Sequence, residues 1–295
     1  MDYRKILVTG VNGQVGHELV RSLQGLGEIV ALDRAALDLS NAAAIREVVR
    51  RVSPSLIINP AAYTAVDRAE TEPALADQIN AHAPGILAEE AKRLGAPLIH
   101  YSTDYVFDGD KHGFYQESDT PAPQNAYGRS KLAGESAIAA AQGTHLIFRT
   151  SWVYGRKGTN FVKTMLRLGA DRDVLRVVGD QYGAPTWSRT IADLTAHILA
   201  QAPRDRDEAG DWWRDRTGIY HLSGGGETSW AGFAEAIFAA ANLACRVDAI
   251  PGTDYPTPAK RPMNSRMSNQ KLLDTFGIAA PHWHVALKQH LESEG

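Results

Sequence analysis

The fold is decided by residues 4–26, RKILVTGVNGQVGHELVRSLQGL, in which a glycine-rich turn separates two regular segments. The apolar run at residues 4–9 predicts a buried strand, and the amphipathic run to about Leu26 predicts a helix. Between them, Gly10, Gly13 and Gly16 allow a tight turn, and the helix N-terminus offers unpaired N–H groups to a pyrophosphate. Strand, turn and helix in this order favour a dinucleotide site over a glycine turn without a ligand, although the spacing is G-x-x-G-x-x-G.

The next strand predicted, residues 28–32, ends at Asp33, about twenty residues after the turn. A carboxylate at this position accepts hydrogen bonds from the adenosine ribose and repels a 2′-phosphate. Arg34 follows directly and is able to pair with that phosphate instead. The cofactor is therefore expected to be NADH or NADPH, with Asp33 favouring NADH.

Strands and helices alternate through the first half of the chain. Further strands are expected at 56–59, 97–101 and 146–149, with helices at 42–51, 73–94 and up to about 141. Such regular alternation predicts an α/β fold, a doubly wound parallel (Rossmann) sheet with a smaller C-terminal substrate-binding lobe. We expect residues 1–154 to form the dinucleotide-binding domain and 184–223 to rejoin it, leaving 155–183 and 224–295 for the substrate lobe.

Composition excludes several classes of protein. The chain has 295 residues, 44% hydrophobic and 22% charged, as in ordinary globular proteins. A net charge of -3 gives no basic field for nucleic acid or an anionic membrane. One cysteine rules out an internal disulfide, and the first apolar run is too short for a signal peptide or membrane span, so a cytoplasmic location is expected. The charge-dense stretch Pro203 to Arg216 is interpreted as a solvated insertion.

Tyr127 and Lys131 carry the predicted chemistry. They stand four residues apart, so on a helix they share one face. An ammonium beside a phenol favours the phenolate and makes proton exchange possible near neutral pH. A hydroxyl of Ser102 or Thr103, at the carboxyl end of the strand at 97–101, would hold the reacting oxygen. Asn80 is interpreted either as a locally satisfied helix residue or as a catalytic one.

These motifs resemble the extended short-chain dehydrogenase/reductase family. The carriers are T-G-x-x-G-x-x-G at 9–16, the Ser-Thr pair at 102–103, and Y-x-x-x-K at 127–131. Strings at 65–70, 100–107, 148–154, 183–186 and 261–266 are most similar to members that reduce 4-keto-6-deoxy sugar nucleotides. The resemblance implies hydride transfer from NADH or NADPH to C4 of a dTDP-deoxysugar, by a monomer or homodimer.

The resemblance also implies the roles of individual residues. Tyr127 would donate the proton, Lys131 would lower its pKa and bind the nicotinamide ribose, and Thr103 would position the carbonyl. Substrate contacts would come from Thr103, Asp104, Trp152 and Arg261, where a surface salt bridge of the arginine is an equally good interpretation. The implied cofactor contacts are Gly10, Gly13, Gln14, Val15, Gly16, Asp33, Asp38, Leu39, Ala62, Tyr63, Thr64, Tyr101, Tyr127 and Lys131.

One position departs from the family pattern. Some of these enzymes resemble dimers joined through a magnesium ion held by glutamates, and Glu18 matches the first of these. Arg189 stands where the second is expected, and a cation there repels the metal. We therefore expect no bound metal and not that particular dimer.

Two other functions remain as alternatives. A sugar-nucleotide dehydratase or epimerase of the same fold would need a second acid/base, but Tyr105 stands where dehydratases have a glutamate. A non-catalytic NADP-binding subunit, like the regulatory subunit of methionine adenosyltransferase, would not need Thr103, Tyr127 and Lys131 together. The presence of all three residues, Thr103, Tyr127 and Lys131, favours a reductase.

Overall fold

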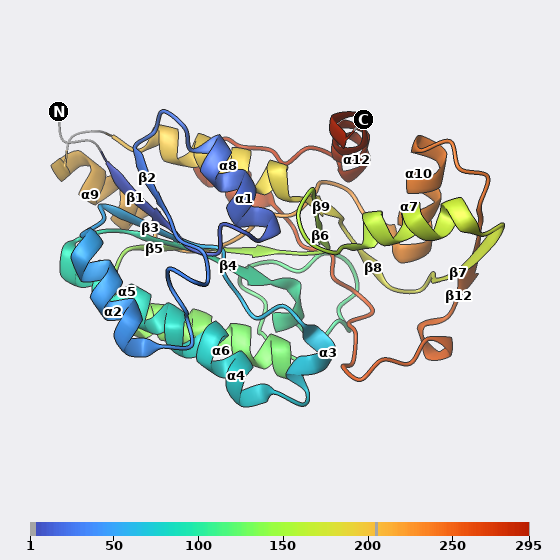
Figure 1. Ribbon diagram of the computed structural model, residues 1–295, viewed down its shortest axis with the longest axis horizontal. Helices are drawn as coiled ribbons and strands as arrows, with labels where there is room; N and C mark the ends of the chain where they lie inside the picture. The colour runs from blue at the N-terminus through green and yellow to red at the C-terminus, as the bar shows by residue number, and fades with distance from the viewer. Residues whose placement is uncertain (1–3, 204–205, 295) are drawn as a thin grey trace.

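The computed structural model describes residues 4–203 and 206–294. Residues 1–3 of the first predicted domain, residues 204–205 of the predicted insertion and residue 295 lie outside the described part. The centre is a six-stranded parallel sheet in the order β10-β5-β4-β3-β1-β2 (Figure 1). Its strands are β1 (Lys5–Val8), β2 (Glu28–Ala31), β3 (Leu56–Asn59), β4 (Leu98–Thr103), β5 (His145–Thr150) and β10 (Gly218–His221). The predicted α/β class with a doubly wound parallel sheet is confirmed.

Helices cover both faces of the sheet, which explains why its strands are apolar on both sides (Figure 1). Ile6 and Val8 face one layer and Leu7 faces the other. The first layer is built from α1 (Gln14–Ser22), α8 (Ser188–Gln201), α9 (Arg206–Asp215) and α11 (Gln270–Phe276). The second contains α2 (Ala42–Val52), α5 (Ala83–Leu94) and α6 (Ala126–Ala140). None of the helices within 4–203 and 206–294 is long and apolar enough to cross a bilayer.

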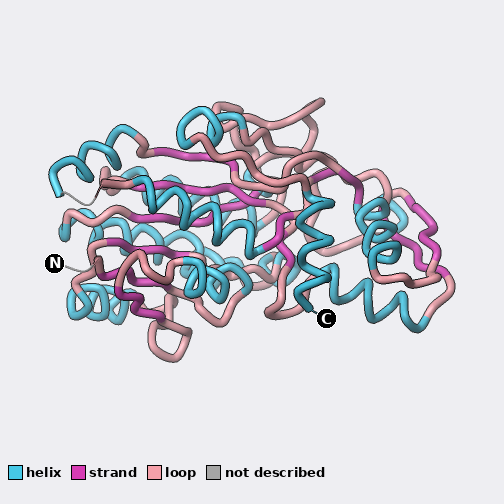
Figure 2. The backbone as a smooth tube through the Cα atoms, turned by 90° about the horizontal axis from the view of Figure 1, so that it is seen from above, coloured by secondary structure: helices cyan, strands magenta, loops and turns pink. Residues whose placement is uncertain are grey.

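A separate apolar cluster lies beyond the carboxyl edge of the sheet, at the right of Figures 1 and 2. There β7 and β12 pair in parallel, and the cluster includes Phe233 and Trp283. Its elements are α7 (Phe161–Asp171), β7 (Val174–Val178), α10 (Trp230–Ala240), β12 (Arg246–Ile250) and α12 (Trp283–Glu294). The short pairs β6 (Val153–Tyr154) with β9 (Thr186–Trp187) and β8 (Tyr182–Gly183) with β11 (Thr228–Ser229) join it to the sheet. The predicted domain boundaries remain a prediction.

The single helix predicted at 73–94 is divided in three. It consists of α4 (Pro73–Asp77), a π-helical turn at Gln78–His82, and α5. Pro84 has no N–H to donate to the carbonyl of Asn80, four residues earlier, which breaks the regular hydrogen-bond pattern. That carbonyl faces α6, where a Cβ placed on Gly134 would lie 2.1 Å from it. The wide turn and the glycine together let α5 and α6 pack in close contact.

The interpretation of Pro203 to Arg216 as a solvated insertion is wrong for its described residues. They contain α9 (Arg206–Asp215), and Trp213 is only 6% exposed in the main core. Trp212 stacks beneath the Arg216 guanidinium at 4.7 Å and contacts Phe276 of α11. The prediction relied on the high charge content of this stretch and overlooked its two tryptophans, which pack it against the core.

Gly134→Ala should destabilise the protein, because its Cβ would overlap the Asn80 carbonyl oxygen. We expect a loss of about 1–3 kcal/mol in the free energy of unfolding, measured by urea denaturation. Gly210→Ala in α9 is the matched control, since nothing lies within 4 Å of its Cβ. The control should gain about 0.5–1 kcal/mol from helix propensity. Equal effects of the two substitutions would contradict the close contact of α5 and α6.

Candidate active site

The glycine-rich turn has the shape that a dinucleotide needs. Gly10 has a φ of +58°, and a Cβ on it would lie 2.8 Å from the Cβ of Ala61. A Cβ on Gly16 would lie 2.3 Å from the Gly10 carbonyl oxygen. Gly13 is the N-cap of helix α1. Because glycine has no side chain, no side-chain hydrogen bond caps the first backbone amides of the helix. These amides are therefore left for an anion, so the residues of the turn fit a pyrophosphate.

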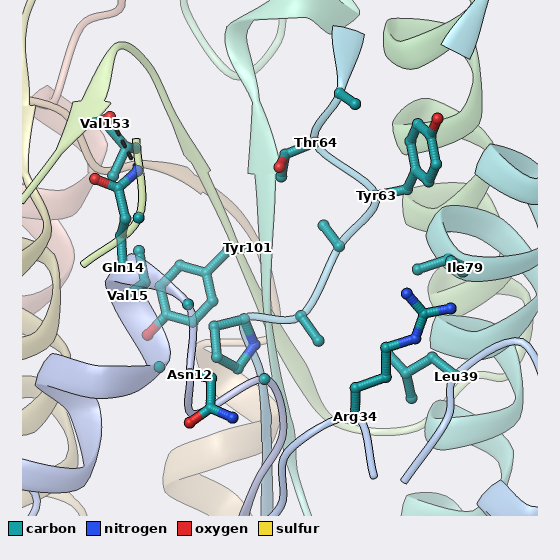
Figure 3. A pocket seen from close by; sticks show the side chains of 18 of the residues that line it. Asn12, Gln14, Val15, Arg34, Leu39, Tyr63, Thr64, Ile79, Tyr101 and Val153 are labelled. Atoms are coloured by element: carbon teal, nitrogen blue, oxygen red, sulfur yellow. Dashed lines mark hydrogen bonds between the residues drawn. The ribbon is translucent and has the colours of Figure 1, made fainter. Parts of the chain in front are cut away.

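A cleft of about 640 Å³ opens beside this turn, a volume typical of small-molecule sites. Figure 3 shows Gln14 on one side, hydrogen-bonded to the Val153 carbonyl at 3.4 Å, and Arg34 and Tyr63 on the other. All the predicted cofactor contacts except Asp33 line the cleft: Gly10, Gly13, Gln14, Val15, Gly16, Asp38, Leu39, Ala62, Tyr63, Thr64, Tyr101, Tyr127 and Lys131. The glycine turn and the Tyr127/Lys131 pair thus face one cavity.

Asp33 does not line the cleft but holds the loop that follows β2, and its contact with a ribose remains a prediction. One oxygen of its carboxylate accepts hydrogen bonds from the amides of Ala35 and Ala36, each at 3.0 Å, and the other accepts from Asn12 at 3.3 Å. These bonds cap the loop after β2. Arg34 instead lines the cleft, where its guanidinium extends toward the space in Figure 3. Arg34 is thus placed to pair with a 2′-phosphate, and the choice between NADH and NADPH remains a prediction.

Tyr127 lies in the first turn of α6, close to the sheet edge. Asn125 caps this helix by accepting from the Gly128 amide at 2.8 Å. A Cβ on Gly128 would lie 2.2 Å from the Tyr105 carbonyl oxygen, so only glycine permits this approach. The ring of Tyr127 meets that of Tyr105 edge-on at 5.6 Å. The phenol is thus held rigidly at the mouth of the cleft, with 9% of its surface exposed.

The Lys131 ammonium is bound to two groups of β4. Its ammonium donates to the Tyr101 carbonyl at 2.7 Å and lies 3.0 Å from His100 Nε2. Burial raises the pKa of Tyr127 above its usual value, and its hydrogen bond with Thr103 opposes this rise. The lowering of the tyrosine pKa, which is expected from Lys131 together with a cofactor cation, remains a prediction.

Thr103 and Asp104 form a buried polar pair beside the phenol. The Thr103 hydroxyl donates to the Asp104 carboxylate at 3.0 Å. Burial raises the pKa of Asp104 to about 6, while hydrogen bonds from Ser265 and Thr103 oppose the change. The predicted Thr103, Asp104 and Tyr127 are therefore brought together, although of these three only Tyr127 lines the cleft.

Asn80 serves the backbone of the cofactor loop. Its side-chain oxygen accepts from the Tyr63 amide at 2.8 Å, and its nitrogen donates to the Tyr63 carbonyl at 3.0 Å and to Ser130 at 3.0 Å. The residue is fully buried and does not line the cleft. The first interpretation, local satisfaction, holds, and its effect is to fix the loop that carries Tyr63 and Thr64.

Trp152 and Arg261, the remaining predicted substrate contacts, already have protein partners. The Trp152 indole stacks on Trp230 at 3.5 Å between ring centroids, and its backbone has a φ of +48°. The Arg261 guanidinium pairs with Asp67 at 2.7 Å. A deoxysugar therefore has only part of the indole surface available, and a diphosphate competes with Asp67 for the arginine.

Several lining residues were missed from the sequence. Thr150 follows the general rule for strand ends, because it closes β5 at the carboxyl edge. Others come from the π-helical turn, from the short strand β6 and from loops, where no sequence pattern marks them. They include Ile79, Val153, Gly158 and Thr159.

The predicted metal positions lie apart from this cleft, on α1 and α8. Glu18 is buried with 6% of its surface exposed, and Arg189 pairs with Asp193 at 3.1 Å. No cluster of three or more His, Cys, Asp or Glu suitable for a metal occurs among residues 4–203 and 206–294. The absence of magnesium remains a prediction.

The parallel sheet, glycine turn and Tyr127/Lys131 pair define an extended short-chain dehydrogenase/reductase. The family model for the RmlD substrate binding domain matches residues 4–294. The dTDP-4-dehydrorhamnose reductase of Burkholderia thailandensis is 50% identical over 291 residues, covering 96% of each chain. The chain belongs to the dTDP-4-dehydrorhamnose reductase family.

Solved structures agree with this assignment. A dTDP-4-dehydrorhamnose reductase of Clostridium acetobutylicum superposes with a TM-score of 0.91 at 37% identity, covering 98% of this chain and 99% of that one. The Bacillus anthracis enzyme, determined in complex with NADP, gives a TM-score of 0.90 at 36% identity, covering 99% of both chains. Family membership favours a reductase over the dehydratase, epimerase and regulatory-subunit alternatives.

Arg34→Gln should weaken NADPH binding about tenfold or more, because a charge-assisted bond to a phosphate is lost. The dissociation constant of NADH should change less than about twofold, since NADH lacks that phosphate. Both constants are measured by cofactor fluorescence, with Arg21→Gln as control because Arg21 bonds only the His17 carbonyl of its own helix. If the substitution weakened the binding of NADPH and NADH equally, Arg34 would not contact the 2′-phosphate.

Protein purified in magnesium and then desalted should contain less than about 0.1 ion per chain. The resemblance places a second ligand at Arg189, and a guanidinium there would repel a divalent cation. Elemental analysis measures this directly, and a stoichiometric ion would contradict the prediction.

Proposed function

We propose that the protein reduces the C4 keto group of dTDP-4-dehydro-L-rhamnose to the alcohol of dTDP-L-rhamnose, using NADPH or NADH. The observation that carries the proposal is the shared cleft, which is lined both by the glycine turn and by Tyr127 and Lys131. Membership of the reductase family supports the substrate, and the NADP found in the Bacillus anthracis relative supports the cofactor. NAD(P)H, when bound, supplies the hydride that C4 receives.

The residues of the chain would supply the proton and hold the substrate. Tyr127 donates its hydroxyl proton to the C4 oxygen, which becomes the alcohol, and solvent later reprotonates the tyrosinate. Thr103 hydrogen-bonds with the phenol and so would keep it aligned with the C4 oxygen. The Lys131 ammonium stabilises the negative charge that the phenol acquires.

Burial makes this assignment chemically reasonable. A phenol with a raised pKa keeps its proton until an acceptor arrives, and this suits a proton donor for reduction. The Lys131 charge is most effective in the same desolvated environment, because the field of a cation is weakly screened there. A monomer or homodimer in the cytoplasm remains the expected state and location.

Tyr127→Phe should lower kcat by about 10²- to 10⁴-fold, which is the usual contribution of a positioned proton donor. The assay follows the loss of nicotinamide absorbance with dTDP-4-dehydro-L-rhamnose, and cofactor affinity should be nearly unchanged. Tyr105→Phe is the matched control, because it removes a neighbouring phenol whose ring lies 5.6 Å away. The control should keep most of its turnover.

Two results would count against the proposal. A Tyr127→Phe variant with most of its kcat would show that another group donates the proton. Wild-type protein that binds NADPH but does not consume it with this substrate would favour a binding module without catalysis.

A further inference from the structure

A chain of buried polar side chains runs from the glycine turn to the lysine of the active site. The Thr9 hydroxyl, directly before Gly10, donates to the Asn59 side chain at 2.6 Å. The Asn59 amide lies 3.1 Å from His100 Nδ1, and His100 Nε2 lies 3.0 Å from Lys131 Nζ. None of these four side chains is more than 1% exposed. They come from the ends of β1 and β3, from β4 and from α6, so the chain crosses three adjacent strands.

The protonation state of His100 determines which way the hydrogen bonds of this series of side chains point. Burial and the neighbouring Lys131 charge hold its pKa well below the usual value, so the ring is neutral. A neutral imidazole has one acceptor and one donor nitrogen. An ammonium has only donors, so Nε2 must accept from charged Lys131, which places the ring proton on Nδ1. There the backbone of Asn59 offers a hydrogen bond.

Lys131 has few other partners for its charge. Its second acceptor is the Tyr101 carbonyl at 2.7 Å, from the same strand as His100. Tyr127 and Glu135 lie one turn away on either side along α6, but Glu135 is bound to Arg149 of β5 at 2.9 and 2.6 Å. Burial lowers the pKa of Lys131 to about 8, and Glu135 only partly opposes this. His100 Nε2 and the Tyr101 carbonyl are thus the two groups that accept hydrogen bonds from the ammonium.

We propose that His100 is a positioning residue that holds the Lys131 ammonium in place and in its charged form. The inference rests on the proposed role of Lys131 beside Tyr127. The backbone carbonyl of Asn59 accepts from Nδ1 and so orients the imidazole toward Lys131. His100 itself does not line the cleft and acts only through Lys131.

A matched pair of variants tests the proposal. Gln and Met have similar length and volume, but only Gln presents an acceptor near the position of Nε2. In cofactor-free protein, the Lys131 titration is followed by 13Cε NMR and assigned by the resonance lost in Lys131→Met. Wild type should titrate near pH 8. His100→Met should lower that midpoint by about one pH unit, because a hydrogen bond to the charged form is lost. His100→Gln should restore the midpoint to within about 0.3 unit.

Turnover gives the second measurement. The ammonium is lost as pH rises through the Lys131 pKa, so the alkaline limb of the kcat profile should move to lower pH in His100→Met by the same amount. In His100→Gln the alkaline limb should lie at the same pH as in the wild type. A purely structural role of His100 would lower kcat equally at all pH values and leave the limb in place.

The outcomes separate the two proposals. An unchanged Lys131 midpoint in His100→Met would overturn the role of His100, whatever the activity. A shifted midpoint in a protein that does not turn over the substrate would keep that role and reject the proposed function. If His100→Met does not fold, 15N NMR of wild-type His100 decides. A neutral ring protonated on Nδ1 below pH 8 supports the proposal, and a ring protonated on Nε2 overturns it.

Discussion

The burial of one ammonium group constrains the arrangement of the whole active site. Lys131 is 1% exposed, and a buried charge costs several kcal/mol unless neighbouring groups compensate. Its acceptors are the Tyr101 carbonyl and His100, so α6 must cross the sheet where β4 presents them. Gly128 and Gly134 permit that crossing, because any side chain there would overlap a backbone oxygen. Tyr127 lies one turn earlier on the same helix, so the position of α6 that Lys131 requires also determines the position of Tyr127.

The parallel sheet explains why residues distant in sequence reach this point. Four of its strands end at the same edge, and each leaves a polar side chain there or just beyond it: Thr9 after β1, Asn59 in β3, Thr103 in β4 and Thr150 in β5. In open α/β folds this edge is where ligands bind. The apolar cluster around Phe233 lies beyond it. The fold thus places polar side chains along one edge of the sheet, and the identity of these side chains determines the chemistry.

Much of this could be predicted from the sequence because it depends on local patterns. The glycine turn, the alternation of strands and helices, and the four-residue spacing of Tyr127 and Lys131 are short-range features. The direction of the Lys131 side chain toward His100 was not predictable, since it depends on the pairing of β3 and β4. The same holds for Asp33, whose bonds to Ala35 and Ala36 depend on how the loop after β2 folds back. Trp213 was missed because a charged composition says little about which face of a helix is buried.

The C-terminal part of the chain returns to the site through the Arg261–Asp67 ion pair, and the Lys260 carbonyl accepts from Asn125 at the start of α6. The last strand of the sheet, β10, also comes late, at 218–221. During synthesis the ribosome therefore releases the glycine turn, the phenol and the lysine long before the segment that fastens them. A nascent chain stalled before residue 260 would carry Tyr127 and Lys131 without the ion pair and the hydrogen bond that the C-terminal part makes beside them.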